Sequence, residues 1–168
     1  MKPINTNRAQ FLRDFLCDRL ERQASSTRRV LAALAEGGQD YRPNPKGSSA
    51  FELAWHIVTG EILLLEAIAR GTFAGIKSSG PLPGSVAAMI ARYDEELPPT
   101  LAKVRALDGD RLAAGVAFAG STKPLVLHIA FVLEHSIHHR GQLTAYLRAM
   151  GAVVPGVLGP SADERPRS

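Results

Sequence analysis

The stretch that decides the fold is PLVLHIAFVLEHSIHHRGQLTAYLRAM, residues 124–150. Its apolar residues recur at steps of three and four positions, which is the spacing of one face of an α-helix. Ser121 or Thr122 can cap the first turn, and Pro124 is tolerated within that turn because its missing N–H would have no partner there. The sequence therefore predicts its strongest helix over residues 122–150.

Three further segments show helical periodicity. The first is followed by Gly37-Gly38, which is expected to end it. The second opens with Ser49 and Glu52 in a capping-box pattern, in which each side chain bonds an unpaired N–H of the first turn. The third contains Pro98-Pro99, whose missing donors predict a kink or a short break. The four predicted helices span residues 7–36, 49–70, 85–107 and 122–150.

The segments between these helices show no convincing strand pattern. Residues 108–120 are expected to form a loop with a short extended piece at residues 116–119. Four helices without strands predict an all-α four-helix bundle, and the long connection between the second and third helices favours a crossover over a tight hairpin. We expect one domain over residues 1–151 and a tail with three prolines over residues 152–168.

The composition suits a single domain with a buried core, since 45% of the residues are hydrophobic and 21% are charged. The net charge of +4 comes from scattered basic residues that do not alternate with aromatic ones, so we expect no nucleic-acid partner. The single cysteine, Cys17, excludes an intramolecular disulfide and is interpreted as a core residue. The polar start and the short apolar runs predict a cytoplasmic protein with no membrane partner.

Three of the five histidines lie within EHSIHHRGQL, residues 134–143. His135 and His139 are one helical turn and about 40° apart, whereas His138 falls on the shoulder of their stripe, about 60° from His135. The stripe includes Phe131 and Val132, so we expect it to face the bundle interior. Two inward imidazoles at this spacing either chelate a metal ion or form a hydrogen-bonded polar pair.

His56, flanked by apolar residues in the second helix, is a candidate third ligand. Gly60, one turn on, would leave room for an ion or a substrate beside its ring. A lone histidine on an apolar face is more often a core residue, but histidines on facing helices favour a catalytic metal centre with three protein ligands and an open position.

Two other metal motifs fit less well. The cluster is not HExxH because residue 136 is a serine, and Glu134 stands one residue too far from His138 for the ExxH step of di-iron bundles. A di-iron centre would also need further inward glutamates, and the pattern shows none. Glu134 itself lies about 100° from the histidine stripe, so we expect it to be exposed.

These features resemble the DinB/YfiT-like family of small four-helix bundles with a crossover topology. The matching residues are His56, the H-x-x-x-H pair His135 and His139, and the following Arg140-Gly141-Gln142, and the resemblance covers residues 7–151. It implies a mononuclear divalent metal site with the three histidines as ligands. Nickel or zinc is the metal that the resemblance favours, with iron or manganese as alternatives.

The resemblance also implies a function, since such proteins include mycothiol-dependent maleylpyruvate isomerase, bacillithiol S-transferases and proteins described as metal-dependent hydrolases. The expected protein is a homodimer whose metal activates water or a low-molecular-weight thiol cosubstrate against a small-molecule substrate. The sequence does not decide between hydrolase and thiol transferase, and it shows no catalytic base. The alternative is a non-catalytic metal- or ligand-binding stress-response protein.

Four further residues are candidates for the pocket or for support of the ligands. Gln142 lies about 20° from His135 on the helical wheel, so it could touch the pocket or support the ligands. His128 and Tyr146 lie on the histidine stripe, where they either contact substrate or are ordinary polar core residues. Glu52 could orient the helix-two histidine, although its capping-box role fits better. Arg140 points away from the stripe and is expected to pair with a neighbouring helix or loop.

Overall fold

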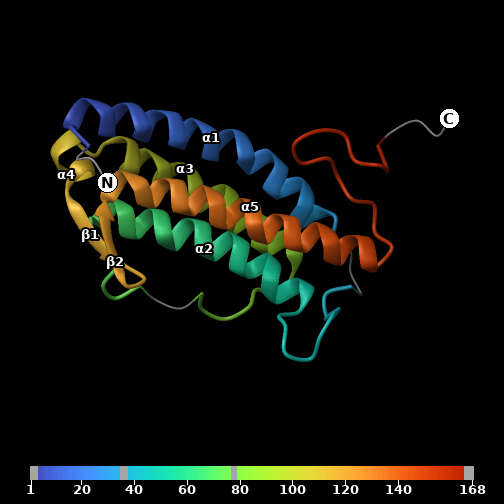
Figure 1. The fold of residues 1–168 in the computed structure, drawn as a ribbon. Coiled ribbons are helices and arrows are strands. Elements are labelled where there is room, and N and C mark those ends of the chain that lie inside the picture. Colours follow the sequence, from blue (N-terminus) through green and yellow to red (C-terminus); the bar gives the residue numbers. More distant parts are fainter. Residues whose placement is uncertain (1–3, 35–37, 77–78, 165–168) are drawn as a thin grey trace.

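The computed structural model describes residues 4–34, 38–76 and 79–164. Long helices form a bundle, and a short helix and a two-stranded hairpin cover one of its ends (Figure 1). The predicted all-α four-helix bundle is confirmed. The elements in chain order are α1 (Thr6–Ala32), α2 (Ala50–Arg70), α3 (Val86–Arg105), α4 (Gly109–Ala113), β1 (Gly115–Phe118), β2 (Ser121–Pro124) and α5 (Leu125–Ala149).

The connection between α2 and α3 is a crossover. α2 packs against both α3 and α5, and α1 packs against both α5 and α3. Arg92 of α3 lies over Trp55 near the start of α2, and Lys103 pairs with Glu66 near its end, so the two helices run in the same direction. The chain therefore has to return along the bundle between them, as Figure 1 shows.

The ends of α2 follow the expected pattern. The Ser49 side chain accepts a hydrogen bond from the N–H of Glu52 at 3.1 Å, and the Glu52 carboxylate accepts one from the N–H of Ser49 at 2.7 Å. At the other end Gly71 adopts a left-handed conformation with φ of 79°, which glycine tolerates at no steric cost. The capping box and the glycine stop are both confirmed.

α1 ends earlier than predicted. Its last helical residue is Ala32 and its C-cap is Ala33, whereas the prediction extended to residue 36. Periodicity locates a helix better than it locates the helix end, because the last turn has no unique signature when no glycine stops it directly. Residues 35–37, including the first glycine of the expected stop, lie outside the described residues.

The segment before α5 differs from the prediction. Residues 121–124 form β2, which pairs antiparallel with β1, so neither Ser121 nor Thr122 caps the helix. The N-cap of α5 is Pro124, and no side chain caps it. The turn between the strands consists of Ala119 with φ of 49° and Gly120 with φ of 76°. Two successive positive φ values suit a tight hairpin, but alanine is a rare choice for the first position, so the usual turn signal is missing.

α3 runs through both prolines without interruption, so the alternative of a break is wrong and a kink stays a prediction. Pro98 and Pro99 both lie on the exposed side of the helix. Water can therefore bond the carbonyl groups that lose a partner. The flanking Leu97 and Leu101 are buried, and their packing holds the helix together on its other side.

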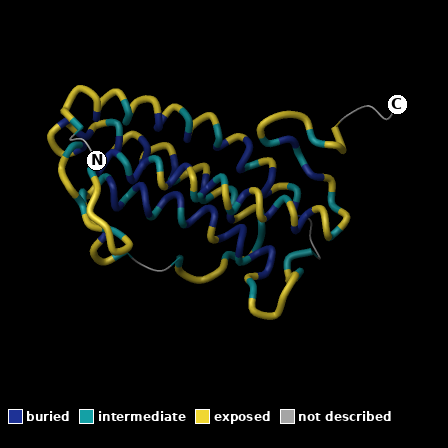
Figure 2. The backbone as a smooth tube through the Cα atoms, viewed as in Figure 1, coloured by how far each residue is buried: buried dark blue, intermediate teal, exposed yellow. Residues whose placement is uncertain are grey.

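The core occupies the inward sides of the four long helices (Figure 2). Cys17 is fully buried, as expected, and its burial raises the pKa of the thiol to about 11. None of the described helices is long and apolar enough to cross a membrane. The described part of the tail folds back on α1, where the Ser26 hydroxyl donates to the carbonyl of Val157 at 3.2 Å. The expected domain boundary at residue 151 stays a prediction.

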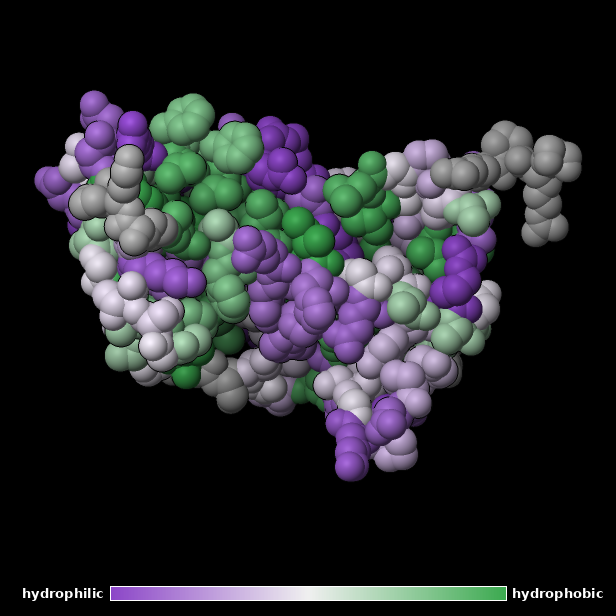
Figure 3. All heavy atoms as spheres, in the orientation of Figure 1, coloured by the Kyte–Doolittle hydropathy of each residue, from purple (hydrophilic) through white to green (hydrophobic). Residues whose placement is uncertain are grey.

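Hydrophobic side chains also gather on the surface, over the first halves of α1 and α5 (Figure 3). Phe11 and Phe15 stack one turn apart on α1 with ring centroids 6.5 Å apart, and Phe11 is 69% exposed. The expected homodimer stays a prediction.

A polar network crosses the centre of the core. Glu61 of α2 is 1% exposed, and its carboxylate accepts hydrogen bonds from Tyr93 of α3 at 3.1 Å and from Ser136 of α5 at 3.0 Å. Burial raises the pKa of this carboxyl to about 7, because the charged form loses its hydration. The expectation that no further glutamate points inward is therefore wrong.

Arg140 lies in the same layer. It is 1% exposed and donates to the hydroxyl of Thr27 at 2.9 Å and to the side chain of Gln23, both on α1. The expected structural pairing of Arg140 with a neighbouring helix is confirmed. Together the buried side chains tie α5 to α1, α2 and α3.

The Glu61 carboxyl makes the stability depend on pH. Below about pH 4.5 it is protonated in both the folded and the unfolded chain; between pH 4.5 and about 7 only the unfolded chain releases the proton. The free energy of unfolding should therefore fall by about 3 kcal/mol as the pH rises through this window, at about 1.4 kcal/mol per pKa unit. Glu61→Gln should remove this slope.

The measurement is denaturant unfolding of both metal-free proteins from pH 4.5 to 7.5. Titration of the histidines is common to both proteins, so it cancels in the difference between their free energies of unfolding. A difference in the free energy of unfolding that stays constant across this range would contradict the assignment.

Candidate metal centre

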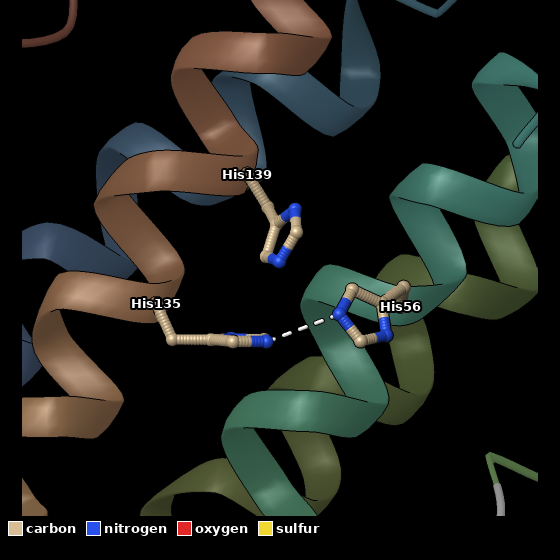
Figure 4. Close-up of side chains that lie close together, drawn as sticks. All are labelled: His56, His135 and His139. Atoms are coloured by element: carbon tan, nitrogen blue, oxygen red, sulfur yellow. Dashed lines mark hydrogen bonds between the residues drawn. The ribbon is translucent and has the colours of Figure 1, made fainter. Parts of the chain in front are cut away.

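Three histidines from two helices converge between α2 and α5. His135 and His139 project from successive turns of α5 toward His56 on α2 (Figure 4). Their candidate ligand atoms all lie within 4.8 Å of one another, and Nε2 of His56 is 3.0 Å from Nε2 of His135. A zinc-type ion binds about 2.0–2.1 Å from each nitrogen, so small rotations of the rings suffice to place all three around one ion.

The cluster lies at the edge of the bundle, so the expectation that the histidine stripe faces the interior is wrong. His56 is exposed, His135 and His139 are half-buried, and Phe131 is 37% exposed. The inward side of α5 instead carries residues such as Ser136, about 100° around the helix. The buried face of α5 is centred on residues such as Ser136 and Leu143, and the histidines lie at its margin. The edge position leaves the candidate metal centre open to small molecules.

Gly60 makes room for one of the rings. A Cβ atom at this position would lie 2.8 Å from Cε1 of His135, a distance that real Cβ atoms essentially never show. We expected Gly60 to leave space beside His56; the space is filled by the ring from the opposite helix. Nδ1 of His135 is buried and has no hydrogen-bond partner among the described residues, so packing against Gly60 and the 3.0 Å contact between Nε2 of His135 and Nε2 of His56 hold this ring in place.

Gln142 holds the third ring from behind. Its Oε1 lies 3.1 Å from Nδ1 of His139, so Nδ1 donates and Nε2 remains available as a ligand. The amide nitrogen of Gln142 donates to the hydroxyl of Tyr146 at 3.4 Å. Tyr146 is buried and packs edge-on against Tyr41, with ring centroids 5.7 Å apart. Two of the candidate supporting residues therefore form a chain that starts at the cluster.

The other candidates lie apart from the cluster. His128 is buried, and its Nε2 lies 3.1 Å from the carbonyl of Val116 in β1. The Glu52 carboxylate is engaged in the capping box and pairs with Arg42 at 3.0 Å. His138 is exposed, and its ring lies 4.8 Å from that of His139, outside the group of candidate ligands.

The electrostatics of the site favour neutral imidazoles. Desolvation by burial, followed by the charge of His139, lowers the pKa of His56. The same causes, with further charge from His56 and His138, lower the pKa of His135 to about 4. Since a metal binds only the unprotonated ring, protons compete weakly for these two at neutral pH. Three imidazole nitrogens suit nickel, zinc or iron, so the donor set fits the implied divalent ion.

A pocket of about 250 Å³ opens beside the cluster. Two of the histidines form part of its wall, and the remaining lining residues are mostly apolar. The sequence pattern placed Phe131 of α5 on the histidine stripe but did not indicate the other apolar members, because they come from the second half of α2, the connection after it and the hairpin. The lining residues are His56, Gly60, Leu63, Leu64, Ile76, Ser79, Phe118, Phe131 and His135.

Known proteins resemble the chain in sequence and in fold. Residues 9–166 match the DinB family. YrdA of Bacillus subtilis (strain 168), an uncharacterized protein, is 26% identical over 145 residues, which are 86% of each chain.

Solved structures share the fold. A DinB-like protein of Bacillus cereus ATCC 10987 superposes with a TM-score of 0.72 at 24% identity, covering 84% of this chain and 95% of the other. The DinB-like protein YjoA of Bacillus subtilis gives a TM-score of 0.69 at 22% identity, covering 84% and 96%. Since the family match extends over most of the sequence, the chain belongs to the DinB family.

Proposed function

We propose that the protein is a metal-dependent enzyme acting on a small molecule, with His56, His135 and His139 as the ligands of one divalent ion. The observation that carries this proposal is the convergence of three imidazoles whose candidate ligand atoms lie within 4.8 Å of one another. A metal bound there would lower the pKa of water or of a low-molecular-weight thiol and so supply a nucleophile at neutral pH.

The chain's own residues hold the ligands and admit the substrate. Gln142 fixes the ring of His139, and Gly60 allows the ring of His135 to lie against α2. Three protein ligands leave positions open on the ion, as catalytic sites require and closed structural sites do not. The pocket beside the ligands gives a substrate access to those positions.

His135→Ala should abolish stoichiometric metal binding, because two imidazoles on separate helices hold a divalent ion far more weakly than three. Elemental analysis after dialysis, together with the shift of the thermal midpoint on adding nickel or zinc, measures the effect. His138→Ala is the matched control and should bind one ion per chain. Equal metal content in both variants would contradict the ligand assignment.

Gly60→Ala should weaken metal binding by about tenfold to a hundredfold, the range found when support for a ligand ring is lost. The added methyl group would overlap the ring of His135 and push it from its place. The control is Gly141→Ala on α5, where a Cβ atom meets nothing within 4 Å. Competition with a chelator gives both metal affinities. Equal losses of metal affinity in the two variants would contradict the role of Gly60 in placing the ring of His135.

Catalysis is tested by turnover. The metal-loaded protein should either hydrolyse members of an ester panel or transfer a low-molecular-weight thiol to an electrophile such as an epoxide or a chloroaromatic compound. Chelation should abolish the activity, and metal should restore it. The active panel distinguishes a hydrolase from a thiol transferase. Metal-loaded protein that is inert to both panels would favour the non-catalytic metal- or ligand-binding protein.

A further inference from the structure

The pocket beside the histidines has a wall built from distant parts of the chain. Leu63 and Leu64 come from α2, Phe131 comes from α5, and Phe118 comes from the hairpin. Two of the candidate metal ligands line the same space, so a molecule in the pocket would lie next to the ion. The pocket is thus an extension of the metal centre.

The described residues that line the pocket include no charged group, and the histidines are their titratable members. Among its described lining residues there is no carboxylate, ammonium or guanidinium group, and Ser79 is the one hydroxyl. A charged group entering this space would lose hydration without gaining a partner, which costs several kcal/mol. An apolar group would instead be removed from water at about 25 cal/mol per Å². The lining therefore selects an uncharged, apolar group.

The size of the pocket limits the group further. An apolar cavity of about 150 Å³ is large enough for benzene. The pocket here has a volume of about 250 Å³, which accommodates one ring or a short branched chain with a small linker. Phe131 is 37% exposed, and its ring lies 6.0 Å from that of His135. A ring in the pocket would cover this exposed apolar surface.

The hairpin is held in place by a buried histidine. Phe118 stacks on Phe73 with ring centroids 4.2 Å apart and meets Phe131 edge-on at 5.4 Å. His128, 3% exposed, donates from Nε2 to the carbonyl of Val116 at 3.1 Å, two residues before Phe118. The carbonyl can only accept, so this contact fixes the proton on Nε2.

We propose that this pocket binds an uncharged aryl or branched alkyl group of the substrate, whose reacting group lies at the three histidines. In this arrangement Phe118 forms part of the wall and His128 is a positioning residue for the hairpin. The location of the reacting group rests on the proposed function, whereas the apolar pocket does not depend on it.

Two hydroxamates that differ only in their apolar group test the proposal on metal-loaded protein. Acetohydroxamate and benzohydroxamate bind a metal through the same oxygens, so their affinity ratio isolates the contribution of the pocket. Benzohydroxamate should bind about tenfold or more tightly, from the buried area of its ring. Its 4-carboxy derivative should lose this gain. Equal affinities for the first two ligands, or a retained gain for the charged one, would overturn the proposal.

Variants locate the effect. Phe118→Ala should remove the gain of benzohydroxamate and leave the affinity for acetohydroxamate unchanged, whereas Phe11→Ala, on the exposed side of α1, should alter neither. His128→Leu should lower the gain, and His128→Gln, which keeps an N–H donor, should retain more of it. If benzohydroxamate still binds more tightly than acetohydroxamate in Phe118→Ala, its ring binds elsewhere and the proposal is wrong.

A failure of the metal site would be recognised separately, because neither hydroxamate would then bind. In that case benzyl alcohol is titrated into chelator-treated protein and followed by amide chemical shifts. Shifts at Gly60, Leu63 and Phe131 that disappear in Phe118→Ala would support the pocket without the metal. Absence of these shifts in the unmodified protein would overturn it.

Discussion

Two neighbouring contacts between α2 and α5 determine the rest of the structure. Gly60 lies against the ring of His135, and the next residue, Glu61, accepts a hydrogen bond from the next side chain on α5, Ser136. One contact faces the edge of the bundle and the other faces its core. Together they fix the register of the helices and place His56 opposite the histidine pair. The core and the candidate metal centre thus depend on one interface.

Burial of the Glu61 carboxylate destabilises the fold, because its charged form loses hydration. Three helices meet at Glu61, through hydroxyl groups of Tyr93 and Ser136, but no cation bonds it directly among the described contacts. The bonds orient the helices in a way that apolar packing alone, which is non-directional, does not. The buried carboxyl therefore favours one relative position of α2 and α5. A shift of α2 against α5 would break its hydrogen bond with Ser136 and move the candidate ligands apart.

The hydrophobic periodicity was enough to predict the four-helix bundle, because four amphipathic segments have few ways to bury their apolar faces. The hairpin was missed because Ala119 occupies a turn position where asparagine or glycine would be the usual signal. Glu61 was missed because a single acid in an apolar segment does not reveal its partners on other helices. The spacing of His135 and His139 predicted a chelating pair with His56 as the candidate third ligand, and the family resemblance implied that all three bind one ion. The pocket depends on tertiary contacts that no local pattern encodes.

The central claim is that three histidines of one chain bind one divalent ion at the α2–α5 interface. X-ray absorption spectroscopy of the nickel- or zinc-loaded protein tests it most directly, because it reports the number and type of ligand atoms. We predict three imidazole nitrogens at about 2.0–2.1 Å for zinc, completed by oxygen donors from solvent. A first shell that contains sulfur, or fewer than three imidazoles at full loading, would contradict it.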